Sequence, residues 1–302
     1  MAQHLAGMYA ALMTAFSDDG AFDPARQSRL NAYVLGQGLT GLYVGGSSGE
    51  SGLLDAEELL AQQEVVAADA RGSGAKLIAH VGLPNLRDSI RLARRAEALG
   101  YDGLSALPPH SYPFSDAEIL GYYRDLAQAT ALPLIVYEVP IRTGRPISLE
   151  TLVEILHLPN VAGIKFTSTD LFKFSMLRRR CPGKLFYFGF DEIYLTGGIL
   201  GADGGIGTTY NLLGGLYAAL DAALRAGQIE KAQALQDASQ IFVESLLDIG
   251  VLPGMKAAFR AIGLDLGLTR APMAQRVLDG DARMRAVLAR PEIACWIGKQ
   301  PG

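Results

Sequence analysis

A repeated unit runs along most of the chain, and it limits the possible folds more than any other feature of the sequence. Each unit has a short apolar run, a turn rich in Gly, Ser, Pro or Asp, and an amphipathic stretch. The apolar runs are Met8–Phe16, Gly41–Val44, Leu77–His80, Gly103–Leu107, Leu134–Tyr137, Val161–Lys165, Leu185–Gly189 and Gly204–Gly207. Continuous apolar strands that alternate with helices are typical of a parallel sheet covered on both faces. Because eight such units close a barrel, the sequence predicts a (β/α)8 TIM barrel of the α/β class.

The amphipathic stretches predict the helices of this barrel. Those with the clearest helical pattern are Asp55–Ala70, Ser89–Leu99, Asp116–Ala129 and Leu149–Leu156. Ser115 and Ser148 stand where helix N-caps are expected, and Gly100 and Gly201 stand where helices should end. The start and stop signals therefore agree with the period of the apolar pattern.

The chain has 302 residues, which is enough for one barrel of about 250 residues with an addition. We predict that residues 1–225 form the barrel and that residues 226–302 form a helical region packed on it, because the sequence stays helix-rich after the eighth unit. The rival architecture is an open doubly wound sheet. Gly45–Glu50 lacks the lysine of a phosphate loop, and Gly204–Gly207 opens no dinucleotide fingerprint, so the barrel is favoured.

Composition and charge narrow the class of protein. Hydrophobic residues make up 49% of the chain and charged residues 19%, and the formal net charge is -4. This composition suits a large folded core and lacks the basic excess that binds nucleic acid or an anionic membrane. No run is long and apolar enough to cross a bilayer, and no basic segment precedes the apolar N-terminal stretch. We expect a cytoplasmic protein with no nucleic-acid and no membrane partner.

The cysteines and histidines give no sign of a metal centre. Cys181 and Cys295 lie far apart and outside any metal-ligand spacing, which indicates two free thiols in a reducing compartment. The histidines form no HExxH motif and no close pair; they are His4, His80, His110 and His157. We therefore expect no metal site.

Active sites of barrels lie at the C-terminal ends of the strands, so the polar residues that end apolar runs are the first candidates for chemistry. Lys165 ends the sixth run, where desolvation would free a neutral amine that attacks carbonyl groups. Tyr137 ends the fifth run, where a phenol could shuttle protons. The alternatives are a lysine whose stem packs while its ammonium reaches water, and an ordinary core tyrosine.

Two further segments could bind a substrate. The turn Gly45–Glu50 follows the second run, and its backbone N–H groups with the hydroxyls of Ser47 and Ser48 could hold a carboxylate. Asp191 and Glu192 follow the seventh run and could bind the hydroxyls of a polyol. The alternatives are a Gly-rich turn with a Ser cap, and an N-cap Asp with a first-turn Glu.

Four stretches together resemble the N-acetylneuraminate lyase and dihydrodipicolinate synthase family. They are Gly41–Glu50, Tyr137–Pro140, Gly163–Lys165 and Gly201–Gly207. The resemblance covers about Gly7 to Leu264, with the motifs in the order and spacing of the family. It implies a barrel with a helical C-terminal region, a homotetramer, and a class I aldolase mechanism without metal or separate cofactor.

The resemblance also implies roles for individual residues. Lys165 forms an imine with the keto carbon of pyruvate, Tyr137 relays protons, and Ser47 and Ser48 hold the pyruvate carboxylate. The substrate is thus a small 2-keto acid. In the sialic acid lyase branch, which this sequence resembles more closely, a further set lines the site and the sugar chain. In this sequence that set is Thr167, Gly189, Asp191, Glu192, Ile206 and Thr208.

Three positions depart from that branch. Arg142 resembles the synthase branch, where an Arg binds the carboxylate of the aldehyde partner; alternatively, Arg142 faces solvent or pairs with Glu138. Glu138 replaces the Asn that is usual after the Tyr. Ser111 stands where the family commonly has a Tyr that reaches into the neighbouring subunit's site, which bears on the proton relay.

The sequence therefore supports a lead function and two alternatives. The lead is a carbon–carbon lyase that cleaves or forms a 2-keto sugar acid, with N-acetylneuraminate as the first candidate substrate. The second is dihydrodipicolinate synthase, which condenses pyruvate with aspartate semialdehyde, or a related 2-keto-3-deoxy sugar acid aldolase. The third is a family member that binds a keto acid without turning it over.

Overall fold

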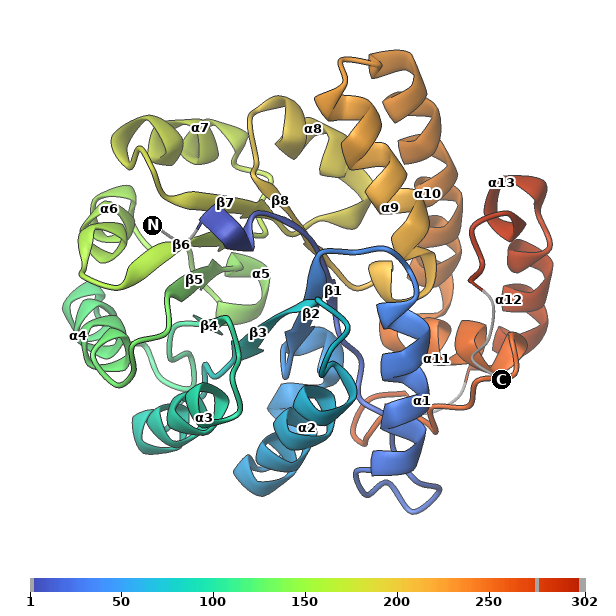
Figure 1. The fold of residues 1–302 in the computed structure, drawn as a ribbon, viewed down its shortest axis with the longest axis horizontal. Coiled ribbons are helices and arrows are strands. Elements are labelled where there is room, and N and C mark those ends of the chain that lie inside the picture. The colour runs from blue at the N-terminus through green and yellow to red at the C-terminus, as the bar shows by residue number, and fades with distance from the viewer. Residues whose placement is uncertain (1–2, 275–276, 299–302) are drawn as a thin grey trace.

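The chain forms a closed barrel of eight parallel strands, in sequence order from β1 to β8. The computed structural model describes residues 3–274 and 277–298. The strands are β1 Gly7–Ala11, β2 Gly41–Val44, β3 Lys76–His80, β4 Gly103–Ala106, β5 Leu134–Glu138, β6 Val161–Phe166, β7 Leu185–Phe188 and β8 Gly204–Gly207. Figure 1 shows them at the centre of a ring of helices. The predicted TIM barrel is confirmed.

The first predicted strand is too long. Within Met8–Phe16 the strand ends at Ala11, although the rest of the run is buried. Beyond Ala11, side-chain amides accept hydrogen bonds that a neighbouring strand would otherwise accept. Asn211 accepts one from the N–H of Met13 at 3.1 Å, and Gln27 accepts one from the N–H of Ala15 at 3.0 Å. An apolar run indicates burial, and it does not by itself indicate strand pairing.

The helices of the ring follow the predicted pattern. They are α1 Pro24–Leu35, α2 Ala56–Asp69, α3 Leu86–Ala98, α4 Asp116–Ala127, α5 Pro140–Thr143, α6 Leu149–His157, α7 Leu171–Arg180, α8 Tyr194–Ile199 and α9 Tyr210–Arg225. Ser115 and Ser148 cap α4 and α6 through their hydroxyl groups, as predicted. Gly100 and Gly201 follow α3 and α8 with left-handed φ angles of 81° and 90°, which explains the glycine at both positions.

The two main hydrophobic cores lie outside and inside the barrel, and a third, small cluster of Leu107, Tyr137 and Val139 lies at the C-terminal ends of the strands. The larger core lies between the strands and the helices, and the smaller one fills the barrel with side chains that include Tyr9, Tyr187 and Ile206. The hydroxyls of Tyr9 and Tyr187 both donate to the carbonyl of Leu5, in the short helix η1 Gln3–Leu5. The N-terminal end of the barrel is therefore closed by packing, and only the C-terminal ends of the strands can form an open site.

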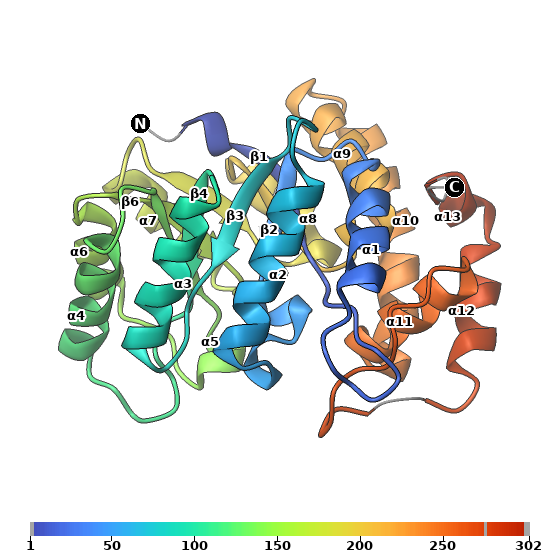
Figure 2. The same cartoon turned by 60° about the horizontal axis from the view of Figure 1, so that its bottom comes forward.

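A helical extension follows the barrel, as the sequence predicts. It contains α10 Ile229–Ile249, α11 Val251–Ala261, α12 Gly280–Leu288 and α13 Pro291–Ala294. Figures 1 and 2 show α10 beside α9 and α11 beside α1, where the rings of Tyr33 and Phe259 lie 5.7 Å apart. The predicted boundary after residue 225 falls between α9 and α10. It stays a prediction as a domain boundary, and residues 275–276 and 299–302 of the second region lie outside the described residues.

Three further features concern partners and ligands. Cys181 is buried, Cys295 is exposed, and both are free thiols, as predicted. Within residues 3–274 and 277–298, no helix combines the length and apolar character needed to cross a membrane. In the same residues, no three or more His, Cys, Asp or Glu side chains are grouped so that they could hold a metal ion.

Candidate active site

Lys165 lies at the C-terminal end of β6 with its side chain inside the mouth of the barrel. Its neighbours in the sheet are Tyr137 on β5 and Tyr187 on β7, and adjacent residues of parallel strands point to the same face. Nζ of Lys165 is 4.1 Å from the ring centre of Tyr137 and 4.4 Å from that of Tyr43. The residue is only 4% exposed. The structure thus brings the two predicted catalytic side chains together.

The amine of Lys165 is buried without a counter-ion. It forms no ion pair with any residue in the described part of the chain. Burial lowers its pKa, and the nearby Arg142 adds to this, whereas Tyr137 and the charge of Asp191 act in the opposite direction. A lowered pKa increases the fraction of neutral amine, which is the form that attacks a carbonyl carbon.

An aromatic cluster surrounds this amine, and two of its members were missed in the sequence. Tyr43 donates its hydroxyl to Ser105 at 3.0 Å, and its ring centre lies 5.8 Å from that of His80. Nε2 of His80 accepts a hydrogen bond from the N–H of Leu107 at 3.3 Å. Burial, reinforced by Lys165, lowers the pKa of His80 to about 3, so this ring is neutral at physiological pH. His80 ends its predicted strand, so the rule that selected Lys165 would also have found it.

The turn after β2 packs against this aromatic cluster and reaches the end of β8. Ser47 begins the short helix η2 Ser47–Gly49, and the hydroxyl of Ser48 lies 2.7 Å from that of Thr208, beyond β8. A side chain at Gly46 would place its Cβ 2.5 Å from the ring of Tyr43. Glycine there lets the backbone of the turn approach the aromatic cluster.

A second group of predicted residues lies at the ends of β6 to β8. A Cβ at Gly189 would lie 1.9 Å from Oγ1 of Thr167, so only glycine leaves room for that hydroxyl. Oγ1 of Thr167 is buried and has no hydrogen-bond partner among the described residues. A buried hydroxyl without a partner is costly, and it is therefore available for a bound molecule. Ile206 belongs to the core inside the barrel.

Asp191 is tied to the neighbouring strand end. Its Oδ2 accepts hydrogen bonds from the N–H and the hydroxyl of Thr209, both at 2.7 Å. Burial raises the pKa of Asp191 to about 6, against these hydrogen bonds. The alternative that Asp191 caps its own helix is wrong, because the short helix η4 Asp191–Ile193 has no side-chain cap. Glu192 is half-buried beside it.

Glu138 and Arg142 point in different directions. The Glu138 carboxylate lies outside the barrel, 3.3 Å from Nζ of Lys173 on α7, and it also accepts from the N–H of Ile147. The alternative pairing of Arg142 with Glu138 is therefore wrong. Arg142 is exposed on α5 and forms no ion pair with the described residues. It is close enough to Lys165 to contribute to the lowered pKa of that amine.

A cavity of about 1160 Å³ opens above the barrel mouth. Its lining includes Ser47, Ser111 and Arg142, together with Leu252 and Pro253 at the start of α11. The serine turn and the arginine of the predicted site therefore face one space. The position that the family commonly gives to a Tyr also faces that space, as Ser111.

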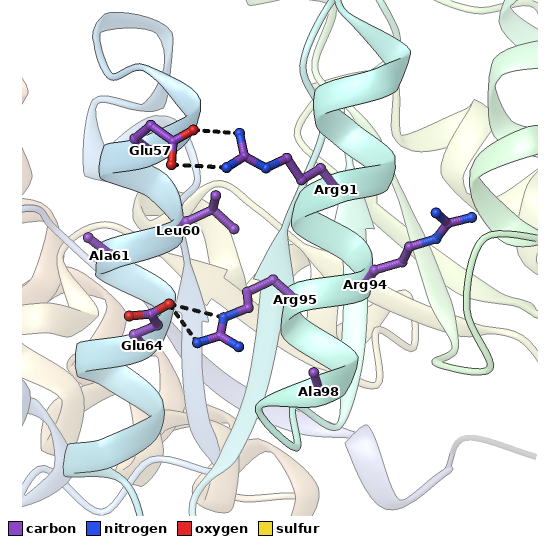
Figure 3. Close-up of a pocket in the computed structure, with 8 residues that line it drawn as sticks. All are labelled: Glu57, Leu60, Ala61, Glu64, Arg91, Arg94, Arg95 and Ala98. Atoms are coloured by element: carbon purple, nitrogen blue, oxygen red, sulfur yellow. Dashed lines mark hydrogen bonds and ion pairs between the residues drawn. The ribbon is translucent and has the colours of Figure 1, made fainter.

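A groove between α2 and α3 contrasts with this cavity. Figure 3 shows its two ion pairs, Glu57 with Arg91 at 2.5 Å and Glu64 with Arg95 at 2.6 Å, while Arg94 points away from α2. These pairs lie on exposed helix surfaces, and none of the predicted site residues lines the groove. Exposed pairs of this kind contribute little, so we assign the groove no catalytic role.

Comparisons with curated proteins find relatives that match most of the chain. An N-acetylneuraminate lyase of Rhizobium meliloti is 43% identical over 286 residues, which are 94% of this chain and 95% of that protein. An N-acetylneuraminate lyase of Escherichia coli is 41% identical over 257 residues, which are 85% of this chain and 86% of that protein.

Solved structures and a family-wide comparison lead to the same group. CdNal from Clostridium difficile, in complex with mannosamine, has a TM-score of 0.92 and 29% identity and covers 97% of this chain and 99% of its own. A dihydrodipicolinate synthase from Bacillus anthracis has a TM-score of 0.89 and 27% identity, with 95% and 98% covered. Residues 4–290 match the sequence profile of the Dihydrodipicolinate synthetase family. The resemblance predicted from the motifs is confirmed, and the chain belongs to this family.

Proposed function

We propose that this protein is a Schiff-base aldolase that cleaves or forms a 2-keto sugar acid, with N-acetylneuraminate as the lead substrate. The observation that carries the proposal is the environment of Lys165. Its amine is buried, has no ion-pair partner among the described residues, and lies between the rings of Tyr43 and Tyr137. An amine at the end of a barrel strand, with a pKa that burial lowers, is suited to attack a keto group.

The covalent chemistry needs only the amine and a proton carrier. Nζ of Lys165 attacks the keto carbon and water leaves, so that a C=N bond replaces the C=O bond. The protonated imine accepts the electron pair of the bond between the adjacent methylene carbon and the hydroxyl-bearing carbon beyond it. That hydroxyl loses its proton to the phenol oxygen of Tyr137 while Tyr137 passes its own proton on to solvent, and as it does so an aldehyde leaves and an enamine remains. Protonation of the enamine carbon and hydrolysis of the imine release pyruvate and restore Lys165.

The other site residues would hold the substrate. Ser47 and Ser48, with the backbone of their turn, would bind the carboxylate of the keto acid. The unpartnered hydroxyl of Thr167 would accept or donate to the part of the substrate nearest Lys165. No metal and no separate cofactor takes part in this proposal, because the imine itself is the electron sink.

Selection of the sugar chain would fall to the ends of β7 and β8. Glu192, Thr208 and the free oxygen of Asp191 would meet the hydroxyl groups, and Gly189 and Ile206 would shape the floor. Thr209 already engages Oδ2 of Asp191, so this carboxylate can use only its second oxygen for a ligand. The lyases of Rhizobium meliloti and Escherichia coli support N-acetylneuraminate as the first substrate to test.

Arg142 supports a second candidate, the condensation of pyruvate with aspartate semialdehyde. It is exposed, faces the cavity above the barrel mouth, and has no ion-pair partner among the described residues. A guanidinium in that position is suited to grip a carboxylate through two parallel hydrogen bonds. A sugar acid with a second carboxylate, as for a related 2-keto-3-deoxy sugar acid aldolase, would use the same residue.

Two assays test the proposal. Borohydride reduces the imine, so that reduction in the presence of pyruvate should leave one carboxyethyl group on Lys165, identified by peptide mass spectrometry. An adduct on another lysine only, or none, contradicts the mechanism. The enzyme should then consume N-acetylneuraminate and leave aspartate semialdehyde with pyruvate unchanged. In Arg142→Leu, unchanged turnover of N-acetylneuraminate supports the lyase, whereas selective loss of a carboxylate-bearing aldehyde substrate supports the second candidate.

Assembly and compartment rest on the family and the composition. We infer a homotetramer in the cytoplasm. The mass of the native protein in solution, from light scattering, should be four times that of the chain.

A further inference from the structure

A buried ion pair joins the turn after β2 to the C-terminal helical region. Glu50 ends that turn, and Lys256 lies on α11; their side chains are 0% and 1% exposed and their charged atoms lie 3.0 Å apart. Two charges that are taken out of water are stable only when they satisfy each other and have further hydrogen bonds. Nζ of Lys256 also donates to the carbonyl of Leu268 at 2.8 Å, and Oε2 of Glu50 accepts from the N–H of Arg270 at 2.7 Å.

The backbone of Glu50 needs this support. Its φ of 60° and ψ of 28° lie in the left-handed region, which side chains other than Gly, Asn and Asp rarely adopt. Its N–H donates to the carbonyl of Ser47 at 3.1 Å, so the conformation of Glu50 determines how the turn closes behind the serines. A strained residue of this kind persists only where its surroundings hold it in place.

The two sides of the turn are held by different forces. On the barrel side, the hydroxyl of Thr14 donates to the carbonyl of Gly49 at 2.5 Å, and the hydroxyl of Ser48 meets that of Thr208. On the outer side, the contacts are those of the Glu50 carboxylate with the C-terminal region. The first turn of α11 also lines the cavity that Ser47 faces. The helix that holds the turn therefore also forms a wall of the site.

The surroundings of Lys256 are charged on several sides. Its Nζ lies 4.2 Å from the ring centre of Phe16, and the guanidinium of Arg270 lies 4.5 Å from the same ring. Arg270 pairs with Glu58 at 2.6 Å. Lys256 thus belongs to a cluster of alternating charges that links the chain after β1, the turn after β2 and α11.

We propose that the Glu50–Lys256 ion pair holds the Ser47–Ser48 turn in the conformation that binds the carboxylate of the keto acid, which makes Lys256 a positioning residue. The inference rests on the proposed function. Lys256 is buried behind Glu50, so it acts on the substrate only through the turn. Its loss should weaken keto-acid binding more than it slows the reaction of bound substrate.

Lys256→Met tests this, with Lys173→Met as the matched control. Among the described residues, Lys173 is the other buried lysine with a carboxylate partner, Glu138, and it lies on α7 away from the turn. The readout is the pyruvate concentration for half-maximal borohydride trapping, at a temperature where circular dichroism shows both variants folded. Lys256→Met should raise that concentration by about tenfold to a hundredfold, with the trapping rate at saturation changed by less than about threefold. Lys173→Met should leave it unchanged, and Lys256→Arg should recover most of the affinity.

Hydrogen exchange gives a readout that is independent of catalysis. Amides in a peptide that spans residues 45–53 should exchange faster in Lys256→Met, and in the milder Glu50→Gln, than in the wild type and in Lys173→Met. Hydrogen exchange can be measured even if the wild type traps no pyruvate. Failure to trap pyruvate would overturn the proposed function and not the role of the ion pair in holding the turn. Equal exchange in both methionine variants, or an equal shift of the pyruvate concentration, overturns the positioning role.

Discussion

Lys165 and the pair Lys173 and Lys256 are all buried, yet they occupy two kinds of environment. Lys173 and Lys256 each lie against a buried carboxylate, that of Glu138 at 3.3 Å and that of Glu50 at 3.0 Å. Lys165 has two tyrosine rings and no such partner in the described part of the chain. A carboxylate holds an ammonium in place and opposes its loss of a proton, whereas burial without such a partner favours the neutral amine.

This difference shows that burial alone does not identify a nucleophile. Burial also lowers the pKa of Lys256, to about 8, although Glu50 opposes the effect. An amine that titrates in this range could be mistaken for a reactive group. The distinction lies in the partner: a lysine that a carboxylate holds is directed away from any substrate, and a lysine among phenols at a strand end is open to one.

The largest expected effect is the loss of activity caused by Lys165→Arg. A guanidinium stays protonated and cannot form an imine, so kcat/KM for the sugar acid should fall by about 10⁴-fold or more. The matched variant Lys173→Arg should retain imine trapping on Lys165. Steady-state kinetics and borohydride trapping of both proteins make the comparison. Substantial activity in Lys165→Arg would remove the basis for separating the two environments.

The next effect concerns the two faces of β5. Tyr137 points into the barrel and Glu138 points out of it. Tyr137→Phe removes the proton carrier and should lower kcat by about 10²–10⁴-fold. Glu138→Gln keeps the shape of the outer side chain, and we expect kcat to change by less than about tenfold. Steady-state kinetics with N-acetylneuraminate measure kcat for both variants. A lower kcat for Glu138→Gln than for Tyr137→Phe would contradict this prediction.

Loss of the ion pair between Lys173 and Glu138, outside the barrel, should affect the stability of the protein and not its catalysis. Lys173→Met leaves Glu138 buried without its partner, which should lower the free energy of unfolding by about 3–5 kcal/mol. The double variant Lys173→Met with Glu138→Leu should recover much of that loss, since no unpaired charge remains. Urea denaturation measures both. A double variant no more stable than the single one would mean that packing, and not charge, dominates at this position.

The smallest effect is a pH dependence at Asp191. Its folded pKa of about 6 lies above the ordinary value of 3.8. Its contribution to stability is therefore complete below about pH 4 and is lost as the pH rises through about 6. Relative to Asp191→Asn, the wild type should lose about 2–3 kcal/mol of unfolding free energy between about pH 4 and about pH 7. Urea denaturation at both pH values checks this, and a constant difference between the two proteins would contradict the raised pKa.

The sequence alone determined the architecture and the central pair of the proposed site. Eight apolar runs and the caps at Ser115 and Ser148 sufficed for the barrel, and the polar ends of two runs selected Lys165 and Tyr137. These signals are local, because strand burial, helix capping and the position of a strand end each depend on a few consecutive residues. The rule failed in the second half of the first run, where side-chain amides accept the hydrogen bonds of Met13 and Ala15.

Only the tertiary structure decided which partner each buried carboxylate has. The partners of Glu50, Glu138 and Asp191 are Lys256, Lys173 and Thr209, which lie on other elements of the chain. Closure of the barrel and packing of α11 bring these groups together. No periodic pattern in the sequence indicates which of these distant residues will be in contact. Because a buried charge is stable only with its partner in place, the roles of the buried lysines depend on contacts between distant segments. The residue type by itself is the same in all three.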